Sequence, residues 1–108
     1  MKQNTLRSLR AAAILFIVIL PSGLLAQTAD KVAAGEQLYT DYCSTCHGFE
    51  LKNTGGVTFD LRRLRPDDHD RFVNSVLNGK SQMPPWRGVL NGEQIESIWA
   101  FIRATVDR

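Results

Sequence analysis

The sequence predicts an all-α domain in which three main helices are joined by irregular loops. Apolar residues recur at three- and four-residue spacing in three separate segments, which is the spacing of a helix with one buried face. Residues that favour helix ends flank two of these segments: Pro66 and Asn91 stand at starts, and Gly79 stands at a stop.

The first 26 residues have the order of a secretory signal peptide. The basic start, apolar run, break and cleavable end are Lys2, Arg7 and Arg10, residues 11–20, Pro21-Ser22-Gly23, and Leu24-Leu25-Ala26. We expect cleavage after Ala26, which leaves residues 27–108 as one mature domain in the periplasm or another exported location. An uncleaved membrane anchor is the alternative, but the apolar run is shorter than the roughly 18 residues of a spanning helix.

The charge of the predicted mature chain argues against a nucleic-acid partner. Residues 1–26 hold three positive and no negative charges, so cleavage changes the formal net charge from +2 to −1. Interspersed acids and bases with almost no net charge are typical of a soluble surface that does not bind membranes or nucleic acid. A mature chain this short is also near the lower limit for a self-sufficient core, and such domains commonly rely on a cofactor.

The first predicted helix runs toward the only two cysteines. Asp30 is placed to cap its start. Its inward face comprises Gly35, Leu38, Tyr39, Tyr42 and Cys46. Gly35 costs a helix about 1 kcal/mol relative to alanine, which the close approach of another backbone would explain. A tolerated surface glycine is the other interpretation.

The segment Cys43-Ser44-Thr45-Cys46-His47 matches the attachment site of a c-type haem. On one helical turn Cys43 and Cys46 come to the same face, where each thiol can add to a haem vinyl group. His47 follows at once and is placed to ligate the iron. The sequence therefore predicts one covalent haem c, held by Cys43 and Cys46, with His47 as the proximal ligand and the loops wrapped round it.

Three other functions of these cysteines have weaker support. An exported protein could close a disulfide between Cys43 and Cys46, but the adjoining His47 favours haem attachment. A zinc site needs about four protein ligands, and the motif is joined only by the distant His69. A thioredoxin-like redox pair follows a strand in a longer α/β chain, and neither feature is visible.

Regular spacing is lost between residues 48 and 65, where Asn53-Thr54-Gly55-Gly56 is turn-forming. An irregular segment of this length in a small domain is commonly functional or wrapped round another group. Phe59 and Leu61 alternate with polar residues, so we expect both to point inward against the porphyrin. A short strand would give the same alternation.

Pro66 is predicted to open the second helix, with Asp67 and Asp68 at the positive end of its dipole. Its buried stripe and its stop are Phe72, Val73, Val76 and Leu77, followed by Asn78-Gly79. The last helix starts with Asn91 as its cap, Gln94 reaching back to Asn91, and Leu90 packing against Ile95. Its inward face comprises Ile95, Ile98, Trp99 and Ile102, with Phe101 beside it.

Met83 is the predicted distal ligand of the iron. It is the only methionine of the mature chain, and Pro84 and Pro85 stiffen its loop. A thioether opposite the imidazole of His47 would saturate the iron and raise its potential, which suits electron transfer. Core filler is the ordinary role of a lone methionine and the alternative here. Trp86, at the end of this loop, is predicted to pack on the haem.

His69 is the rival ligand, because its spacing from Phe72 and Val76 places it on the inward side of the second helix. It also lies between Asp68 and Asp70 in the first turn, which suits a solvated histidine with a carboxylate neighbour. We therefore predict that His69 is solvated or supports the site indirectly.

The mature chain resembles a class I cytochrome c over essentially its whole length. Gly35 and Tyr39 stand where that family has a glycine and an aromatic residue on its first helix, and Ile98 and Phe101 match its last helix. Gln82-Met83-Pro84-Pro85-Trp86 is similar to the family's methionine loop, and His47 to its proximal ligand.

The resemblance implies the cytochrome c fold, with Gly35 as the crossing point where Phe101 packs. One feature departs from the family pattern. Many members have a proline after the haem motif whose carbonyl accepts the ring N–H of the proximal histidine, but residues 48–65 contain none. A carbonyl near Gly56 could take its place.

A narrower resemblance concerns the electron donor. Thr58-Phe59-Asp60-Leu61-Arg62, Asn78-Gly79-Lys80 and Met83-Pro84-Pro85-Trp86 are similar to small cytochromes and haem domains that serve periplasmic quinoprotein alcohol dehydrogenases. This implies a monomeric one-electron carrier of a respiratory chain, not an enzyme. It would accept electrons from a periplasmic dehydrogenase, such as a PQQ-dependent alcohol dehydrogenase, and pass them to an oxidase or another cytochrome.

Two alternatives stay open at this point. Arg62, Arg63, Arg65 and Lys80 form either a basic rim that orients the redox partner or an ordinary solvated loop. The protein is either an electron carrier or, from a different class, a haem enzyme or gas sensor with an open or displaceable sixth iron site.

Overall fold

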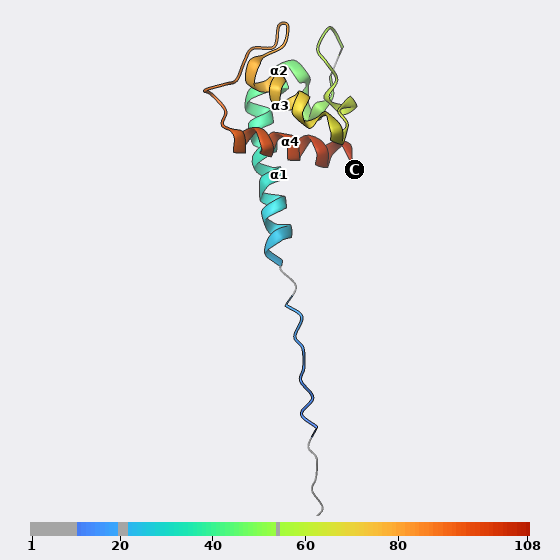
Figure 1. Ribbon diagram of the computed structural model, residues 1–108. Helices are drawn as coiled ribbons and strands as arrows, with labels where there is room; N and C mark the ends of the chain where they lie inside the picture. The colour runs from blue at the N-terminus through green and yellow to red at the C-terminus, as the bar shows by residue number, and fades with distance from the viewer. Residues whose placement is uncertain (1–10, 20–21, 54) are drawn as a thin grey trace, which may run out of the picture.

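The computed structural model describes residues 11–19, 22–53 and 55–108, and the described part is helical, as predicted. Its α-helices are α1 (Ser22–Tyr42), α2 (Ser44–His47), α3 (His69–Asn78) and α4 (Gly92–Val106) (Figure 1). Single 3₁₀ turns are η1 (Phe49–Leu51), η2 (Leu61–Arg63) and η3 (Pro66–Asp68). No extended strand forms in the described residues, so the alternation at Phe59 and Leu61 belongs to a loop and the start of η2.

The first helix is longer than predicted. Asp30 lies inside α1 and does not cap it, because residues 24–34 contain no glycine or proline and the helix propagates through them. The predicted cleavage site after Ala26 therefore lies in the first turns of α1, while residues 1–10 and 20–21 of the predicted signal lie outside the described part. Among the described helices, none combines the length and apolar character needed to cross a membrane.

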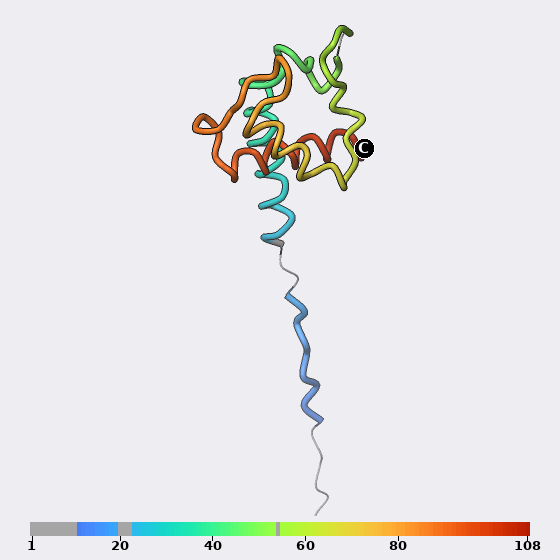
Figure 2. Tube along the Cα trace, turned by 45° about the horizontal axis from the view of Figure 1, so that its top comes forward, coloured from blue at the N-terminus to red at the C-terminus, as the bar shows by residue number. Residues whose placement is uncertain are grey.

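The two long helices, α1 and α4, cross one another (Figures 1 and 2), and Gly35 lies at the crossing. A Cβ atom built on Gly35 would lie 1.8 Å from the Ser97 carbonyl oxygen, so the backbones of α1 and α4 are in direct contact. Gly35 is therefore the crossing point, as the resemblance implied. Phe101 lies one turn after Ser97 and packs on Tyr39, one turn after Gly35, with 5.4 Å between the ring centroids.

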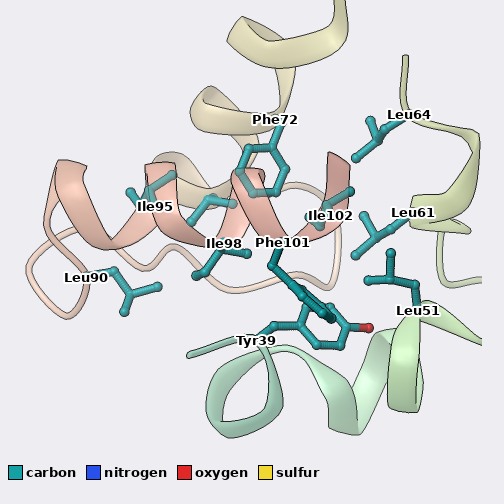
Figure 3. Close-up of a cluster of buried hydrophobic side chains, with 11 residues drawn as sticks. Tyr39, Leu51, Leu61, Leu64, Phe72, Leu90, Ile95, Ile98, Phe101 and Ile102 are labelled. Atoms are coloured by element: carbon teal, nitrogen blue, oxygen red, sulfur yellow. The ribbon is translucent and has the colours of Figure 1, made fainter. Parts of the chain in front are cut away.

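The buried core is built on α4 (Figure 3). It comprises Tyr39, Leu51, Leu61, Leu64, Phe72, Val76, Leu90, Ile95, Ile98, Phe101 and Ile102. The predicted inward faces of α3 and α4 are thereby confirmed, with Val73, Leu77 and Trp99 half-buried beside them.

The predicted ends of α3 and α4 are also confirmed. Asn91 and Gln94 form a reciprocal capping box, in which the Gln94 backbone N–H donates to Asn91 Oδ1 at 2.8 Å and the Asn91 N–H donates to Gln94 Oε1 at 2.9 Å. Pro66 opens the 3₁₀ turn that leads into α3, and Gly79 ends α3 with φ of 75°. Local sequence signals therefore place both helices.

His69 joins α3 to α4. Its Nε2 lies 2.8 Å from Glu96 Oε1, its Nδ1 lies 3.3 Å from Asp70, and its ring packs edge-on against Trp99. The carboxylate neighbour was predicted, but the nearer carboxylate comes from Glu96, which is 27 residues away in sequence. His69 is thus a partly exposed link between two helices.

The stability contribution of His69 should fall as pH rises. The hydrogen bond with Glu96, followed by that with Asp70, raises the pKa of His69 above its usual 6.5. The folded state therefore binds the proton more tightly, so the stabilisation is complete below the unfolded pKa and is lost as pH rises through the folded pKa. We expect His69→Gln to lower Tm more at pH ~5 than at pH ~8.5. The corresponding loss in the free energy of unfolding should be less than about 1 kcal/mol, because solvent screens the pair. An equal loss at both pH values would contradict this.

Candidate functional site

The cysteine motif continues directly from α1. The Cys43 backbone N–H donates to the Tyr39 carbonyl at 2.9 Å, and the His47 N–H donates to the Cys43 carbonyl at 2.9 Å. The motif therefore occupies one turn after α1, as its spacing predicts. Cys43 is half-buried and Cys46 is exposed, and both thiols are free.

Two properties of the motif follow from burial. Burial, and secondarily the neighbouring Cys46, raises the pKa of Cys43 to about 11, so its thiol is protonated at neutral pH. Burial lowers the pKa of His47, which favours the neutral imidazole.

In the described residues, no group of three or more histidine, cysteine or carboxylate side chains is arranged to hold a metal ion, which gives the zinc interpretation no support.

The ring of His47 is oriented by a backbone carbonyl. Nδ1 of His47 lies 3.0 Å from the Phe59 carbonyl oxygen. A carbonyl can only accept, so Nδ1 carries the proton and the lone pair of the neutral ring is on Nε2. The carbonyl that takes the place of the proline carbonyl is therefore that of Phe59, three residues after Gly56. Every residue has a carbonyl, so no side-chain pattern could have identified this one.

A tight turn after His47 fixes the motif against the core. Gly48 has φ of 88°, and a Cβ there would lie 2.0 Å from the Lys52 carbonyl oxygen, so only glycine fits. The Tyr39 hydroxyl donates to the Gly48 carbonyl at 2.6 Å. Burial is the main reason that the pKa of Tyr39 is raised to about 12, which keeps this donor protonated. Leu51 then enters the core.

The methionine loop is closed by its own backbone. Lys80 and Met83 exchange two backbone hydrogen bonds, of 3.0 and 2.9 Å. The Trp86 N–H donates to the Val76 carbonyl at 2.8 Å, which ties the loop to α3. Met83 is half-buried against the core. The loop is therefore fixed at both ends, as its prolines predict.

The three residues predicted to pack on a haem have different surroundings. Leu61 is buried in the core, and Phe59 is 38% exposed with the Arg71 guanidinium 5.1 Å from its ring centroid. Trp86 is half-buried and packs edge-on against Tyr42, beside Cys43. Phe59 thus contacts the motif through its carbonyl, and Trp86 lies against Tyr42, the residue before Cys43. Their contact with a haem stays a prediction.

Acidic neighbours pair with half of the predicted basic rim. Arg62 forms a two-point ion pair with Asp60, with both N···O distances at 2.9 Å. Arg65 lies 3.1 Å from Asp67. Arg63 and Lys80 are exposed. The sequence did not reveal this pairing, which leaves Arg63 and Lys80 as the better candidates for attracting a partner.

The donor set fits a covalently attached haem. It combines two free thiols on one turn, an imidazole whose Nδ1 is engaged so that Nε2 can bind a metal, and a half-buried thioether on a fixed loop. Thioether-forming cysteines with an adjoining histidine define the class of c-type haem proteins. The chemistry of the site therefore indicates a c-type haem protein.

Comparison with known proteins gives the same answer. The family model described as "Cytochrome C oxidase, cbb3-type, subunit III" matches residues 30–102. A cytochrome c6 of Rippkaea orientalis is 32% identical over 98 residues, which cover 87% of this chain and 86% of that protein. The chain belongs to the c-type cytochromes and carries haem c covalently.

Two other relatives mark the breadth of the family. Cytochrome c-555 of Methylococcus capsulatus is 24% identical over 108 residues, covering 98% of this chain and 88% of that protein. The quinohemoprotein alcohol dehydrogenase ADH-IIG of Pseudomonas putida is 36% identical over 84 residues, or 76% of this chain. The match spans only 11% of that dehydrogenase. No solved structure matches significantly.

Proposed function

We propose that Cys43 and Cys46 form the two thioether bonds to the haem, and that His47 Nε2 and Met83 Sδ are its axial ligands. The observation that carries this proposal is the contact of His47 Nδ1 with the Phe59 carbonyl, which leaves Nε2 as the metal-binding nitrogen. The haem, when bound, supplies one iron centre that gains and loses a single electron. His47 would hold the iron with its imidazole and Met83 with its thioether, a ligand pair that would favour one-electron transfer.

The surrounding residues hold the two proposed iron ligands in place and take no part in a reaction. The turn at Gly48 and the hydroxyl of Tyr39 hold the histidine side, and the closed loop around Met83 holds the other side. A saturated iron has no open coordination position for a substrate, so we propose a carrier and not an enzyme. The haem enzyme or gas sensor considered above would require Met83 to leave the iron, which its anchored loop disfavours.

We propose that the chain is exported, is processed near Ala26 and acts as a monomer in the periplasm. Its proposed donor is a PQQ-dependent alcohol dehydrogenase, because the quinohemoprotein alcohol dehydrogenase ADH-IIG contains a stretch 36% identical to this chain. Its proposed acceptor is an oxidase or another cytochrome, in keeping with the cbb3-type family model.

A redox titration of the purified haem-loaded protein, followed by mixing with a quinoprotein alcohol dehydrogenase and its alcohol, tests this function. We expect a one-electron Nernst curve and complete reduction that depends on the alcohol. A two-electron curve, or no reduction when an artificial acceptor is reduced normally, would contradict the proposal.

Removing the exposed basic residues should slow electron transfer only at low salt. Arg63→Ala combined with Lys80→Ala deletes two charges without a close carboxylate partner among the described ion pairs, and rim charges mainly set the association rate. We expect the rate with a quinoprotein dehydrogenase to fall severalfold at low ionic strength and to match wild type at high salt. The matched control deletes the exposed Arg65 and Asp67 pair, which leaves the net charge unchanged. An unchanged salt dependence in the first variant would dispose of the role.

A further inference from the structure

We propose that Asn53 is a positioning residue for the proximal ligand: its side chain holds the Phe59 carbonyl where that carbonyl accepts the ring N–H of His47. This inference rests on the proposed function, in which Nε2 of His47 binds the iron. It extends that function by naming the side chain that replaces the missing loop proline.

The Phe59 carbonyl has no secondary structure to hold it. Phe59 and Asp60 lie in irregular chain between a bent segment, residues 55–58, and η2. On the C-terminal side, Asp60 is fixed because its carboxylate accepts from the Arg62 backbone N–H at 3.0 Å, and Leu61 is buried in the core. A second anchor is needed on the N-terminal side, because one fixed end leaves the peptide before Phe59 free to rotate.

Asn53 provides that anchor through its side-chain amide, which both donates and accepts a hydrogen bond. Its Nδ2 donates to the carbonyl of Thr58, the residue directly before Phe59, and its Oδ1 accepts from the Gly55 N–H at 3.1 Å. Its own backbone N–H donates to the carbonyl of Leu51, which is fully buried. Asn53 therefore links the core to the peptide group next to the acceptor of His47.

The chain between the two ends of this link would otherwise have wide conformational freedom. Gly55 and Gly56 have φ of 112° and 91°, a region that glycine enters at little cost and leaves as easily. The His47 to Phe59 bond at 3.0 Å weakens steeply with displacement or misalignment. Without the Asn53 amide, the carbonyl should drift, and water should become the partner of the Nδ1 proton.

The consequence reaches the iron through ligand basicity. A hydrogen bond from the ring N–H to an acceptor raises the basicity of the metal-binding nitrogen. A more basic ligand stabilises the ferric state more than the ferrous state. Loss of the Phe59 contact should therefore raise the reduction potential, and it should expose the Nδ1 proton to exchange with solvent.

The test compares haem-loaded wild type with Asn53→Ala and Asn53→Ser. Serine can still accept from the Gly55 N–H but is too short to reach Thr58, so both variants lose the proposed contact. We expect the Nδ1 proton of His47 to exchange about tenfold faster by NMR in both. At a fixed ambient potential, we expect at least a threefold higher ratio of reduced to oxidised protein, which corresponds to about 28 mV.

The matched control is Asn74→Ala, which removes an exposed asparagine hydrogen-bonded to Asn78 on α3. It should leave both readouts at wild-type values. Wild-type values in Asn53→Ala, or in Asn53→Ser alone, would overturn the proposal. Loss of folding in both variants would also overturn it, because Asn53 would then be a core residue.

Failure of the proposed function gives a different result. If His47 binds the iron, its ring signals in the wild-type protein shift between the ferric and ferrous states. Signals that do not depend on oxidation state would reject ligation by His47 itself. Signals that do shift, together with unchanged exchange and potential in the Asn53 variants, would reject only the role of Asn53.

Discussion

Replacing Met83 with alanine should remove the weak far-red charge-transfer band of the ferric protein and allow the ferrous protein to bind carbon monoxide. The physical reason is that the proposed thioether ligand would fill one coordination position of the iron, and its loss would leave that position to water or an added ligand. The reduction potential should also fall, because a thioether favours the ferrous state. Absorption spectra with and without carbon monoxide measure the loss of the band and the binding of carbon monoxide.

The neighbouring Gln82 offers the control for Met83. Gln82→Ala alters an exposed side chain of the same loop and should keep the far-red band and the resistance to carbon monoxide. Wild-type protein that binds carbon monoxide readily would contradict ligation by Met83 and would favour the haem enzyme or sensor. Persistence of the far-red band in Met83→Ala would do the same.

Replacing Gly35 with alanine should destabilise the fold strongly. The new Cβ would lie 1.8 Å from the Ser97 carbonyl oxygen and 2.4 Å from its carbon, so two helix backbones must separate. Overpacking of this kind costs about 3 kcal/mol or more, which a domain of this size can scarcely absorb. We expect a large fall in Tm, or no accumulation of haem-loaded protein.

Gly92→Ala is the matched control for Gly35→Ala. Gly92 lies in the first turn of α4, and a Cβ there would meet nothing within 4 Å. Alanine should be neutral or stabilise the helix by up to about 1 kcal/mol. Similar Tm values for the two variants would contradict the account of the crossing.

The sequence was sufficient wherever a structural feature depends on near neighbours in the chain. The cap of α4 at Asn91 and the stop of α3 at Gly79 need only residues three or four positions away. The inward faces of both helices follow from spacing alone. The same reasoning failed at Asp30, because a good local cap competes with an uninterrupted run of helix formers before it.

Contacts between residues far apart in the chain could not be predicted from the sequence. The partner of Gly35 is the backbone of Ser97, and the acceptor for His47 is a backbone carbonyl, so no side chain signals either contact. Glu96 reaches His69 across 27 positions and only after α3 and α4 have packed. The sequence therefore predicted a set of candidate ligands, but it could not predict the groups that orient them.

The central claim is that Cys43 and Cys46 hold the haem and that His47 binds its iron for one-electron transfer. The mass and absorption of the denatured protein test the attachment most directly. We predict that the haem remains attached to the unfolded chain, at the polypeptide mass plus one haem, and that replacing both cysteines with serine releases it. Haem that separates on denaturation of the wild-type protein, or a haem-free chain with an oxidised Cys43–Cys46 pair, would contradict the account.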